Sequence, residues 1–275
     1  MKKASVLIAL SFFALVGLNS CIEVDGLCID QRTVRGSGTL SSEMRPVGDI
    51  NAVELSTIGT LHIKIGDTTS LEIEAEDNLL EYIEADDTGG KLVIDTRNVS
   101  LRTRRPINYY LTVKELKAIE ISSSGDIEAP DLRADRFAIE INSSGNLDMG
   151  DLEARHVRIT VNSSGDITIG DVHATSIAVE INSSGNVRIS GGEVDEQDIN
   201  INSSGDYRAR DLASREAEVN ICSSGNAIIQ VSDYLGADVS SSGDVQYAGD
   251  PKVDSRETSS GDVRKIGGGR RSRSI

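Results

Sequence analysis

Serine, glycine and a carboxylate or amide recur together in this sequence at a spacing that a catalytic site could use. Ser-Ser-Gly followed by Asp or Asn occurs eight times, for example as Ser143-Ser144-Gly145-Asn146. A serine becomes a nucleophile when a histidine in register removes its proton and a turn such as G-x-S-x-G presents it. That turn is missing, and His62, His156 and His173 fall at unrelated positions of the repeat. We therefore expect no catalytic residue and three solvated histidines.

The residue after each of these glycines forms a column of its own. The column runs Asp126, Asn146, Asp166, Asn186, Asp206, Asn226, Asp244 and Asp262. In stacked repeats neighbouring carboxylates would lie about 5 Å apart and repel, and alternation with Asn relieves that repulsion. A row of cation sites, best placed where Asp244 and Asp262 adjoin, is the alternative, but the calcium-binding nonapeptide repeat is missing. The pattern favours a turn feature, so we expect no metal ion and no cofactor.

Carboxylates also recur between the glycines, and Tyr109-Tyr110 forms an aromatic pair. These carboxylates are Asp131, Asp151, Asp171 and Asp211. A polysaccharide lyase or hydrolase built on stacked strands would need such a cluster on one exposed face. The column adjoins Gly150 and Gly170, which indicates a second corner of the repeat instead. The tyrosine pair is either a sugar-binding surface or ordinary strand packing.

The elements that position these residues repeat at a fixed interval. The glycines of the serine motif are separated five times by 20 residues and twice by 18: Gly125, Gly145, Gly165, Gly185, Gly205, Gly225, Gly243 and Gly261. A period of about 20 residues is typical of a solenoid, whereas a propeller blade needs about 40. We predict an all-β fold, a parallel β-helix in which each repeat is one coil and equivalent strands pair about 4.8 Å apart.

Aliphatic columns would fill the interior of this β-helix. Six residues before the glycines stand Ile119, Ile139, Ile159, Val179, Ile199, Val219 and Ala237. Four before stand Ile121, Ile141, Val161, Ile181, Ile201, Ile221 and Val239, and two after stand Ile127, Leu147, Ile167, Val187, Tyr207, Ala227, Val245 and Val263. This period-2 spacing predicts a strand, a turn at glycine and a second strand. With aromatics at 3% of the chain and no Trp, stacked aliphatic rows must supply the core.

The corner itself is expected to be structural. Glycine permits a backbone angle that other residues resist, so it would turn the chain. Parity places the first serine of each motif inward and the second outward, with hydroxyls satisfying backbone groups at the bend. Asn142, Asn162, Asn182 and Asn202 stand three residues before their glycines. Stacked, they would form a side-chain amide ladder.

The two ends of the repeat array differ from its middle. In the last coil the inward positions hold Ser255 and Glu257, which predicts a polar cap over the open sheet edge. Residues 266–275 form a basic tail that we expect to be solvated. Upstream, five strand-like pieces at 50–55, 60–65, 70–75, 91–95 and 107–113 predict irregular first coils or a small β cap, so that the solenoid spans 35–265 and its regular coils 115–265.

The N-terminus has the layout of a lipoprotein signal. Lys2 and Lys3 precede an apolar run that is too short to span a bilayer. The run ends at Leu18-Asn19-Ser20-Cys21, which resembles a lipobox, so residues 1–20 are expected to be removed and Cys21 to carry lipid. Residues 21–34 would then be a tether. Cys28 and Cys222 show no metal-type spacing, and we expect isolated thiols.

Charge narrows the choice of partners. The chain has 28 basic and 44 acidic residues, a formal net charge of −16. That charge argues against nucleic acid as a partner and against an anionic membrane as a docking surface. Attachment to a membrane is therefore expected through the N-terminal lipid alone.

Three motifs resemble those of the auto-transporter adhesin, head GIN domain family. They are Gly36-Ser37-Gly38, Glu76-Asp77-Asn78, and Leu116-Lys117-Ala118-Ile119 leading to Ser122-Ser123-Ser124-Gly125-Asp126. The resemblance covers roughly residues 35–265. It implies a right-handed β-helical stack in an envelope-anchored or secreted bacterial protein, and it implies no catalytic residue.

Together these observations favour a non-enzymatic lipoprotein of the bacterial outer membrane. Its rod would present a repetitive polar face for adhesion to a protein or glycan at the cell surface. A periplasm-facing scaffold or sensor that binds an envelope partner is the alternative, and a β-helical polysaccharide-active enzyme is a further one.

Overall fold

The computed structural model describes residues 32–267. The expected signal 1–20, Cys21, Cys28, most of the tether 21–34 and the tail from residue 268 onward lie outside the described residues. The described part of the chain holds no helix with the length and apolar composition of a membrane span.

The N-terminal part consists of nine strands and one short 3₁₀ turn. They are β1 (Arg32–Arg35), β2 (Leu40–Arg45), β3 (Ala52–Leu55), β4 (Thr60–Ile65), β5 (Ser70–Glu76), η1 (Leu80–Tyr82), β6 (Ile83–Thr88), β7 (Lys91–Thr96), β8 (Val99–Arg102) and β9 (Asn108–Val113). All five strand-like pieces predicted upstream are strands. The prediction missed β1, β2, β6 and β8. Of these, β2 is exposed along most of its length and so carries no apolar alternation.

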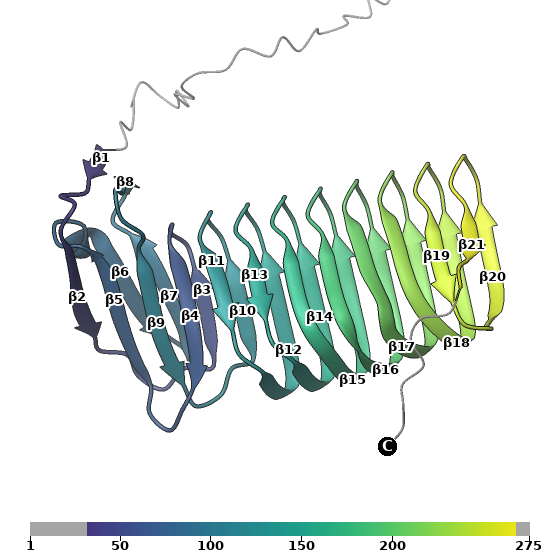
Figure 1. The fold of residues 1–275 in the computed structure, drawn as a ribbon, viewed down its shortest axis with the longest axis horizontal. Helices are drawn as coiled ribbons and strands as arrows, with labels where there is room; N and C mark the ends of the chain where they lie inside the picture. The colour runs from purple at the N-terminus through teal and green to yellow at the C-terminus, as the bar shows by residue number, and fades with distance from the viewer. Residues whose placement is uncertain (1–31, 268–275) are drawn as a thin grey trace, which may run out of the picture.

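The repeat region forms the remaining strands. They are β10 (Ala118–Ile121), β11 (Asp126–Ala129), β12 (Leu132–Ile141), β13 (Leu147–Met149), β14 (Leu152–Val161), β15 (Ile167–Ile181), β16 (Val187–Ile201), β17 (Asp206–Ile221), β18 (Asn226–Val239), β19 (Val245–Ala248), β20 (Lys252–Glu257) and β21 (Val263–Lys265). The chain winds through them as a row of stacked coils (Figure 1).

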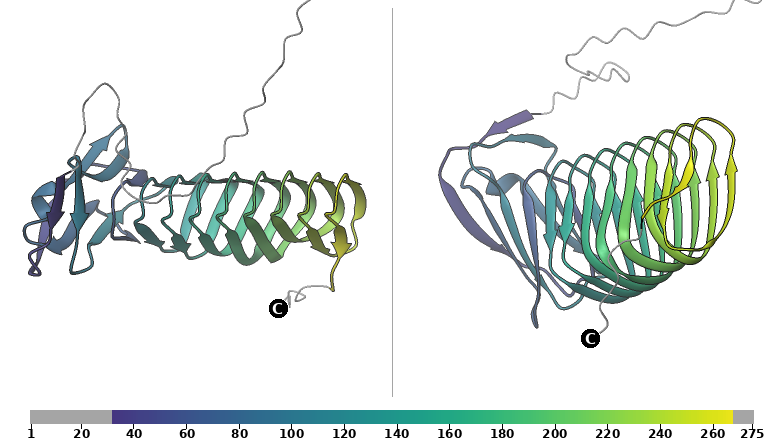
Figure 2. Two further views of the ribbon diagram at one scale, coloured as in Figure 1. Left: turned by 90° about the horizontal axis from the view of Figure 1, so that it is seen from above. Right: turned by 45° about the vertical axis from the view of Figure 1, so that its right-hand side comes forward.

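Successive coils pair in parallel with a register offset equal to the sequence repeat. Ile139 pairs with Ile159, Ile159 with Val179, and Val179 with Ile199. This register confirms the predicted β-solenoid, and Figure 2 shows the coils aligned along one axis. The three predicted aliphatic columns are buried, apart from partly buried Val263 at the end of the stack.

The change from 20 to 18 residues has a visible structural cause. Between β17 and β18 the register shifts, so that Ala209 pairs with Ile229 while Ala213 pairs with Gln230. The later coil therefore skips the positions of Arg210 to Leu212, which include the second corner, and gains one residue between Val231 and Tyr234, so that it is two residues shorter. The shortened coils keep the serine corner and both flanking strands.

The solenoid is closed differently at its two ends. Every residue of β20 is exposed, as predicted for a polar cap at Ser255 and Glu257. At the other end β4 pairs in parallel with β11, and β9, β5 and β2 extend the same sheet, the last two by antiparallel pairing. The N-terminal part is therefore a mixed β cap fused in register with the first coil, and its strands lie beside the coils in Figure 1.

Candidate functional site

The corner glycines are required for space, and the expectation that they supply a special backbone angle is wrong. The glycines with positive φ are Gly38, Gly59, Gly89, Gly90, Gly192 and Gly249, none of which belongs to the serine motif. A Cβ on Gly185 would instead lie 2.6 Å from Val161 Cγ1 and 2.8 Å from the Ser163 carbonyl oxygen, and closer still to the Gly165 carbonyl. Only a residue without a side chain lets consecutive corners stack this closely.

Hydrogen bonds at the corner run mainly along the solenoid axis through the backbone. The N–H of Gly185 donates to the carbonyl of Ser163 at 3.0 Å, and the N–H of Gly205 to that of Ser183 at 3.1 Å. The first serine of each motif is thus used through its carbonyl, where the prediction had used its hydroxyl. Its side chain is partly buried and that of the second serine is exposed in most coils, in keeping with the predicted parity.

The predicted asparagine ladder is present. Asn162 donates to Asn142 at 2.8 Å, Asn182 to Asn162 at 2.9 Å and Asn202 to Asn182 at 2.7 Å, each from Nδ2 to Oδ1. Each amide therefore has its partners within the stack. These side chains are exposed, yet they are committed to holding coils together.

The alternating Asp and Asn column is a second ladder. Its alternation does more than separate the carboxylates, because each Asn is hydrogen-bonded to the Asp of the neighbouring coil. The N–H of Asn146 and its Nδ2 both donate to Asp126 Oδ1 at 2.9 Å, and the N–H of Asp166 donates to Asn146 Oδ1 at 3.0 Å. Each asparagine thus donates hydrogen bonds to the carboxylate of the preceding coil and stabilises its charge. Asp244 and Asp262 adjoin, and Arg264 Nη2 lies 3.7 Å from Asp244.

The second carboxylate column also belongs to a corner. Asp131 Oδ1 accepts from the N–H of Asp151 at 2.9 Å, and Asp151 Oδ1 from that of Asp171 at 2.8 Å. These carboxylates bond to the backbone of the next coil. Within residues 32–267 no group of three or more His, Cys, Asp or Glu side chains is placed to hold a metal ion.

The three histidines do not converge. His62 Nδ1 lies 2.9 Å from Glu128 Oε2, and its ring stacks on Tyr110 with centroids 5.2 Å apart. His156 Nδ1 lies 2.9 Å from Ser176 Oγ, and His173 lines a separate surface hollow. Cys222 is an exposed free thiol.

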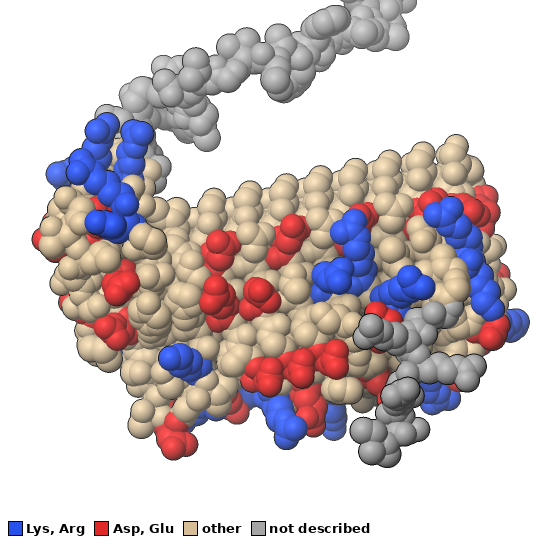
Figure 3. Space-filling model, viewed as in Figure 1, with Lys and Arg blue, Asp and Glu red and all other residues tan. Residues whose placement is uncertain are grey.

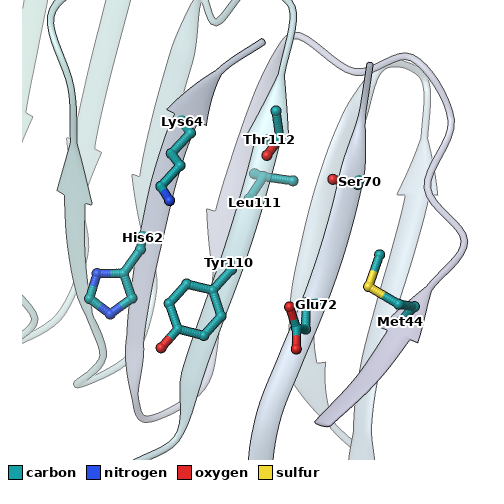
Figure 4. Close-up of a pocket in the computed structure, with 8 residues that line it drawn as sticks. All are labelled: Met44, His62, Lys64, Ser70, Glu72, Tyr110, Leu111 and Thr112. Carbon is teal, nitrogen blue, oxygen red and sulfur yellow. The ribbon is translucent and has the colours of Figure 1, made fainter. Parts of the chain in front are cut away.

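A shallow hollow of about 330 Å³ opens on the outer face of the cap sheet, around the stacked His62 and Tyr110. Figure 4 shows its lining on strands β2, β4, β5 and β9: Met44, His62, Lys64, Ser70, Glu72, Tyr110, Leu111 and Thr112. Tyr109, next to Tyr110 in sequence, points inward and is fully buried, with its hydroxyl donating to the Ile58 carbonyl at 3.1 Å. The tyrosine pair thus splits between core and surface. The hollow combines an aromatic face with an acid and a base, which suits a polar ligand whose ring can stack on the tyrosine.

Two of the short motifs, residues 36–38 and 76–78, lie against each other. The carboxylate of Glu76 is fully buried. It accepts from the N–H of Gly38 at 2.6 Å and from the N–H of Arg104 at 2.9 Å. A buried carboxylate is tolerated only when such bonds satisfy it. Glu76 therefore holds two distant loops onto the end of β5.

The contact between residues 36–38 and 76–78 also fixes an arginine-rich projection, the two-stranded sheet of β1 and β8. Asn78 Nδ2 donates to the Arg35 carbonyl at 2.8 Å, next to the two-stranded sheet of β1 and β8. The exposed arginines here are Arg32, Arg35, Arg102, Arg104 and Arg105. Figure 3 shows blue side chains gathered at this end of the molecule. Basic charge is thus concentrated locally on an acidic chain.

An acidic cluster lies on another face of the late coils. Burial raises the pKa of Glu218, and the charges of Asp198, Asp254, Glu196 and Glu216 raise it further. The Glu218 carboxylate lies over Gly236, where no side chain competes for the space. The neighbouring acidic residues therefore destabilise the ionised form of Glu218. Among the described residues, no Lys or Arg forms an ion pair with this cluster.

Sequence reasoning missed the hollow. It also missed the clasp, by which we mean the hydrogen bonds from Gly38 and Arg104 to the buried carboxylate of Glu76. The hollow assembles side chains from four strands whose pairing is antiparallel in part, and no short-range pattern encodes that pairing. A signal for the clasp was available in the two quoted motifs, but their contact joins residues about 40 positions apart.

Comparison with known proteins gives one family and several related folds. The family model "Putative auto-transporter adhesin, head GIN domain" matches residues 49–251. No protein of curated function matches the chain.

Three solved structures share the fold. A "putative lipid binding protein" from Parabacteroides distasonis is 24% identical, with a TM-score of 0.78 over 86% of this chain and 100% of its own. A "putative adhesin" from Parabacteroides merdae is 20% identical, with a TM-score of 0.76 over 86% and 99%. A second P. distasonis "putative adhesin" is 21% identical, with a TM-score of 0.73 over 85% and 100%.

Proposed function

Because the chain belongs to the auto-transporter adhesin, head GIN domain family, we propose that it is a non-enzymatic, adhesin-like protein of the bacterial cell envelope. The asparagine and aspartate columns support the non-enzymatic part of this proposal, since their side chains are engaged in joining coils. In this account the corners build the rod, and the side chains on its faces make the contacts with a partner.

The observation that carries the proposal is the concentration of exposed apolar side chains on the cap sheet. Of the five large exposed hydrophobic residues in the described chain, Leu40, Met44, Ile65 and Tyr110 lie on β2, β4 and β9. Met44 and Tyr110 of this group line the hollow itself, and exposed apolar side chains at an open hollow mark an interaction surface. A glycan ring stacking on Tyr110, with Lys64 and Glu72 as polar partners, is the ligand class that fits this lining.

We further propose that the protein is a lipoprotein of the outer membrane, attached through lipid on Cys21 and facing the cell exterior. The arginine-rich projection supports an orientation in which the N-terminal end lies toward the membrane, since arginines favour anionic head groups. Protease shaving of intact cells tests the orientation. Cleavage supports exposure at the surface, and protection with cleavage after permeabilisation contradicts it.

Binding of the purified chain to a printed array of polysaccharides and extracellular-matrix proteins tests the ligand surface. We expect binding by the wild type and its loss in Tyr110→Ala. Tyr234→Ala is the matched control, because Tyr234 is a solvent-accessible tyrosine on β18, far along the stack. Equal binding by Tyr110→Ala and Tyr234→Ala would contradict the assignment of the ligand surface to the hollow.

A further inference from the structure

One row of outward side chains crosses the entire sheet that runs from the cap to the last coil. Strand register places next to one another, in order, Glu72, Tyr110, His62, Glu128, Asp148, Thr168, Arg188, Arg208, Ile228, Gln246 and Arg264. None of these residues is buried. We call this set the outward row.

The chemistry of the outward row is antisymmetric about Thr168. One coil before Thr168 stands Asp148 and one coil after it stands Arg188; two coils before stands Glu128 and two coils after stands Arg208. Figure 3 shows the same separation, with acidic side chains over β11 and β13 and basic ones over the later coils of this face. At the first and second steps from Thr168, an acid on one side is therefore matched by a base on the other.

This antisymmetry makes the face complementary to a second copy of itself. A two-fold axis that runs above Thr168, midway between the two faces and along the strand direction, reverses the order of coils and keeps each column opposite its own equivalent. Asp148 then faces Arg188 of the second copy, and Glu128 faces Arg208. In a parallel dimer, each carboxylate would instead face the same carboxylate of the second copy. We propose that the protein forms an antiparallel dimer through the outward row.

The charges at the centre of the row are available for such contacts. Within the described chain neither Asp148 nor Arg188 has an ion-pair partner within 4.0 Å. Arg208 pairs with Asp206 at 2.7 Å, and Glu128 with His62 at 2.9 Å, but both Arg208 and Glu128 remain more than half exposed. Each chain has a net charge of −16, but repulsion between charges more than about 8 Å apart is largely screened at physiological salt. The charge pairs in direct contact therefore determine whether the two faces attract each other.

Beyond its central charges the row holds one more acid–base pair, Glu72 with Arg264, and two pairings without opposite charges. At three, four and five coils from Thr168 the pairing sets His62 against Ile228, Tyr110 against Gln246 and Glu72 against Arg264. Eleven rows at the strand spacing of about 4.8 Å extend over roughly 50 Å.

The dimer would cover the hollow around Tyr110 with the last coils of the partner. Ligand binding there and self-association would then exclude each other. This consequence depends on the proposed function, whereas the dimer itself does not.

Charge reversal at one pair tests the dimer by sedimentation velocity. In Glu128→Arg both symmetry-related contacts set two bases opposite each other, and in Arg208→Glu both set two acids opposite each other. Each variant alone is expected to dimerise about tenfold or more weakly than the wild type. An equimolar mixture of the two variants restores two attractive contacts in the mixed dimer, so association returns on mixing. The double variant E128R/R208E is also expected to dimerise.

The controls are charge reversals on exposed residues of other faces, Asp195→Arg and Arg158→Glu. They are expected to dimerise like the wild type, and circular dichroism checks that every variant is folded. A wild type that stays monomeric up to about 1 mM would overturn the proposal, since even weak specific association is measurable there. So would single variants that dimerise normally, or a mixture that stays monomeric.

Discussion

Substitution of an interior corner glycine tests the reason why the motif repeats. In Gly185→Ala the new methyl group would overlap the preceding coil, because a Cβ there lies 2.6 Å from Val161 Cγ1 and 2.8 Å from the Ser163 carbonyl oxygen. The coil must rise by roughly 1 Å against a strand spacing of about 4.8 Å. It is clamped by β15 below and β17 above, so it cannot move without loosening both contacts.

The magnitude follows from the bonds that such a movement stretches. Gly185 donates to Ser163 at 3.0 Å and Asn186 to Asp166 at 2.9 Å, both from backbone N–H groups. Two or three such bonds at about 0.5–1.5 kcal/mol each, with overpacking of the aliphatic row, lower the free energy of unfolding by about 2–4 kcal/mol. Urea unfolding followed by circular dichroism would show a midpoint lower by about 1 M.

Gly261 supplies a matched control for this prediction. A Cβ on Gly261 meets the same groups, 2.5 Å from Val239 Cγ1 and 3.0 Å from the Ser241 carbonyl oxygen. No further coil stacks beyond it in the described chain, so the last coil can lift away and Gly261→Ala should lower the free energy of unfolding by only about 1 kcal/mol. Equal losses for the two variants, or a loss below about 0.5 kcal/mol for Gly185→Ala, would refute the steric explanation.

Three further outcomes follow from other parts of the structure. Tyr207→Phe removes the hydroxyl that donates to buried Gln197 at 2.8 Å, so urea unfolding should report a loss of about 1–2 kcal/mol; no loss would mean that water replaces the hydroxyl. Glu218→Gln should raise the melting temperature at pH 7 by relieving repulsion worth about 0.2–1 kcal/mol with Asp198 opposite. Because the folded state raises the pKa of Glu218, that gain exists where the carboxyl would be ionised and should fade as pH falls toward its ordinary value of 4.5; a gain unchanged at pH 4 would contradict this origin. Glu76→Ala should speed amide hydrogen exchange in residues 32–38 and 99–105, while the coils keep their protection; unchanged exchange there would contradict the role of the clasp.

The solenoid could be predicted from the sequence because its contacts repeat. A residue in one coil meets the equivalent residue of the next, so the columns of Ile139 and Ile141 predict both burial and register. The asparagine ladder followed for the same reason. The sequence could not reveal why glycine is required at the corner, because conformational freedom and lack of space demand the same residue.

The cap and its hollow depend on contacts that no period encodes. The antiparallel pairing of β2 with β5 joins Met44 to Glu72 across 28 positions, and β2 lacks an apolar face that would reveal it. The motif around Glu76 could be recognised in the sequence but its burial could not, because an acidic residue is buried only when distant backbone groups satisfy it. The proposed ligand surface therefore lies in the part of the molecule that sequence periodicity describes least.

The most direct test compares a face variant with a corner variant in one binding measurement. The printed array of polysaccharides and matrix proteins is probed with Tyr110→Ala and with Asn162→Ala, at equal folded concentrations verified by circular dichroism. If corners only build the rod, Asn162→Ala retains wild-type binding and Tyr110→Ala loses it. Loss of binding in folded Asn162→Ala, with Tyr110→Ala unaffected, would place the contact surface on the serine and asparagine corners and contradict this account.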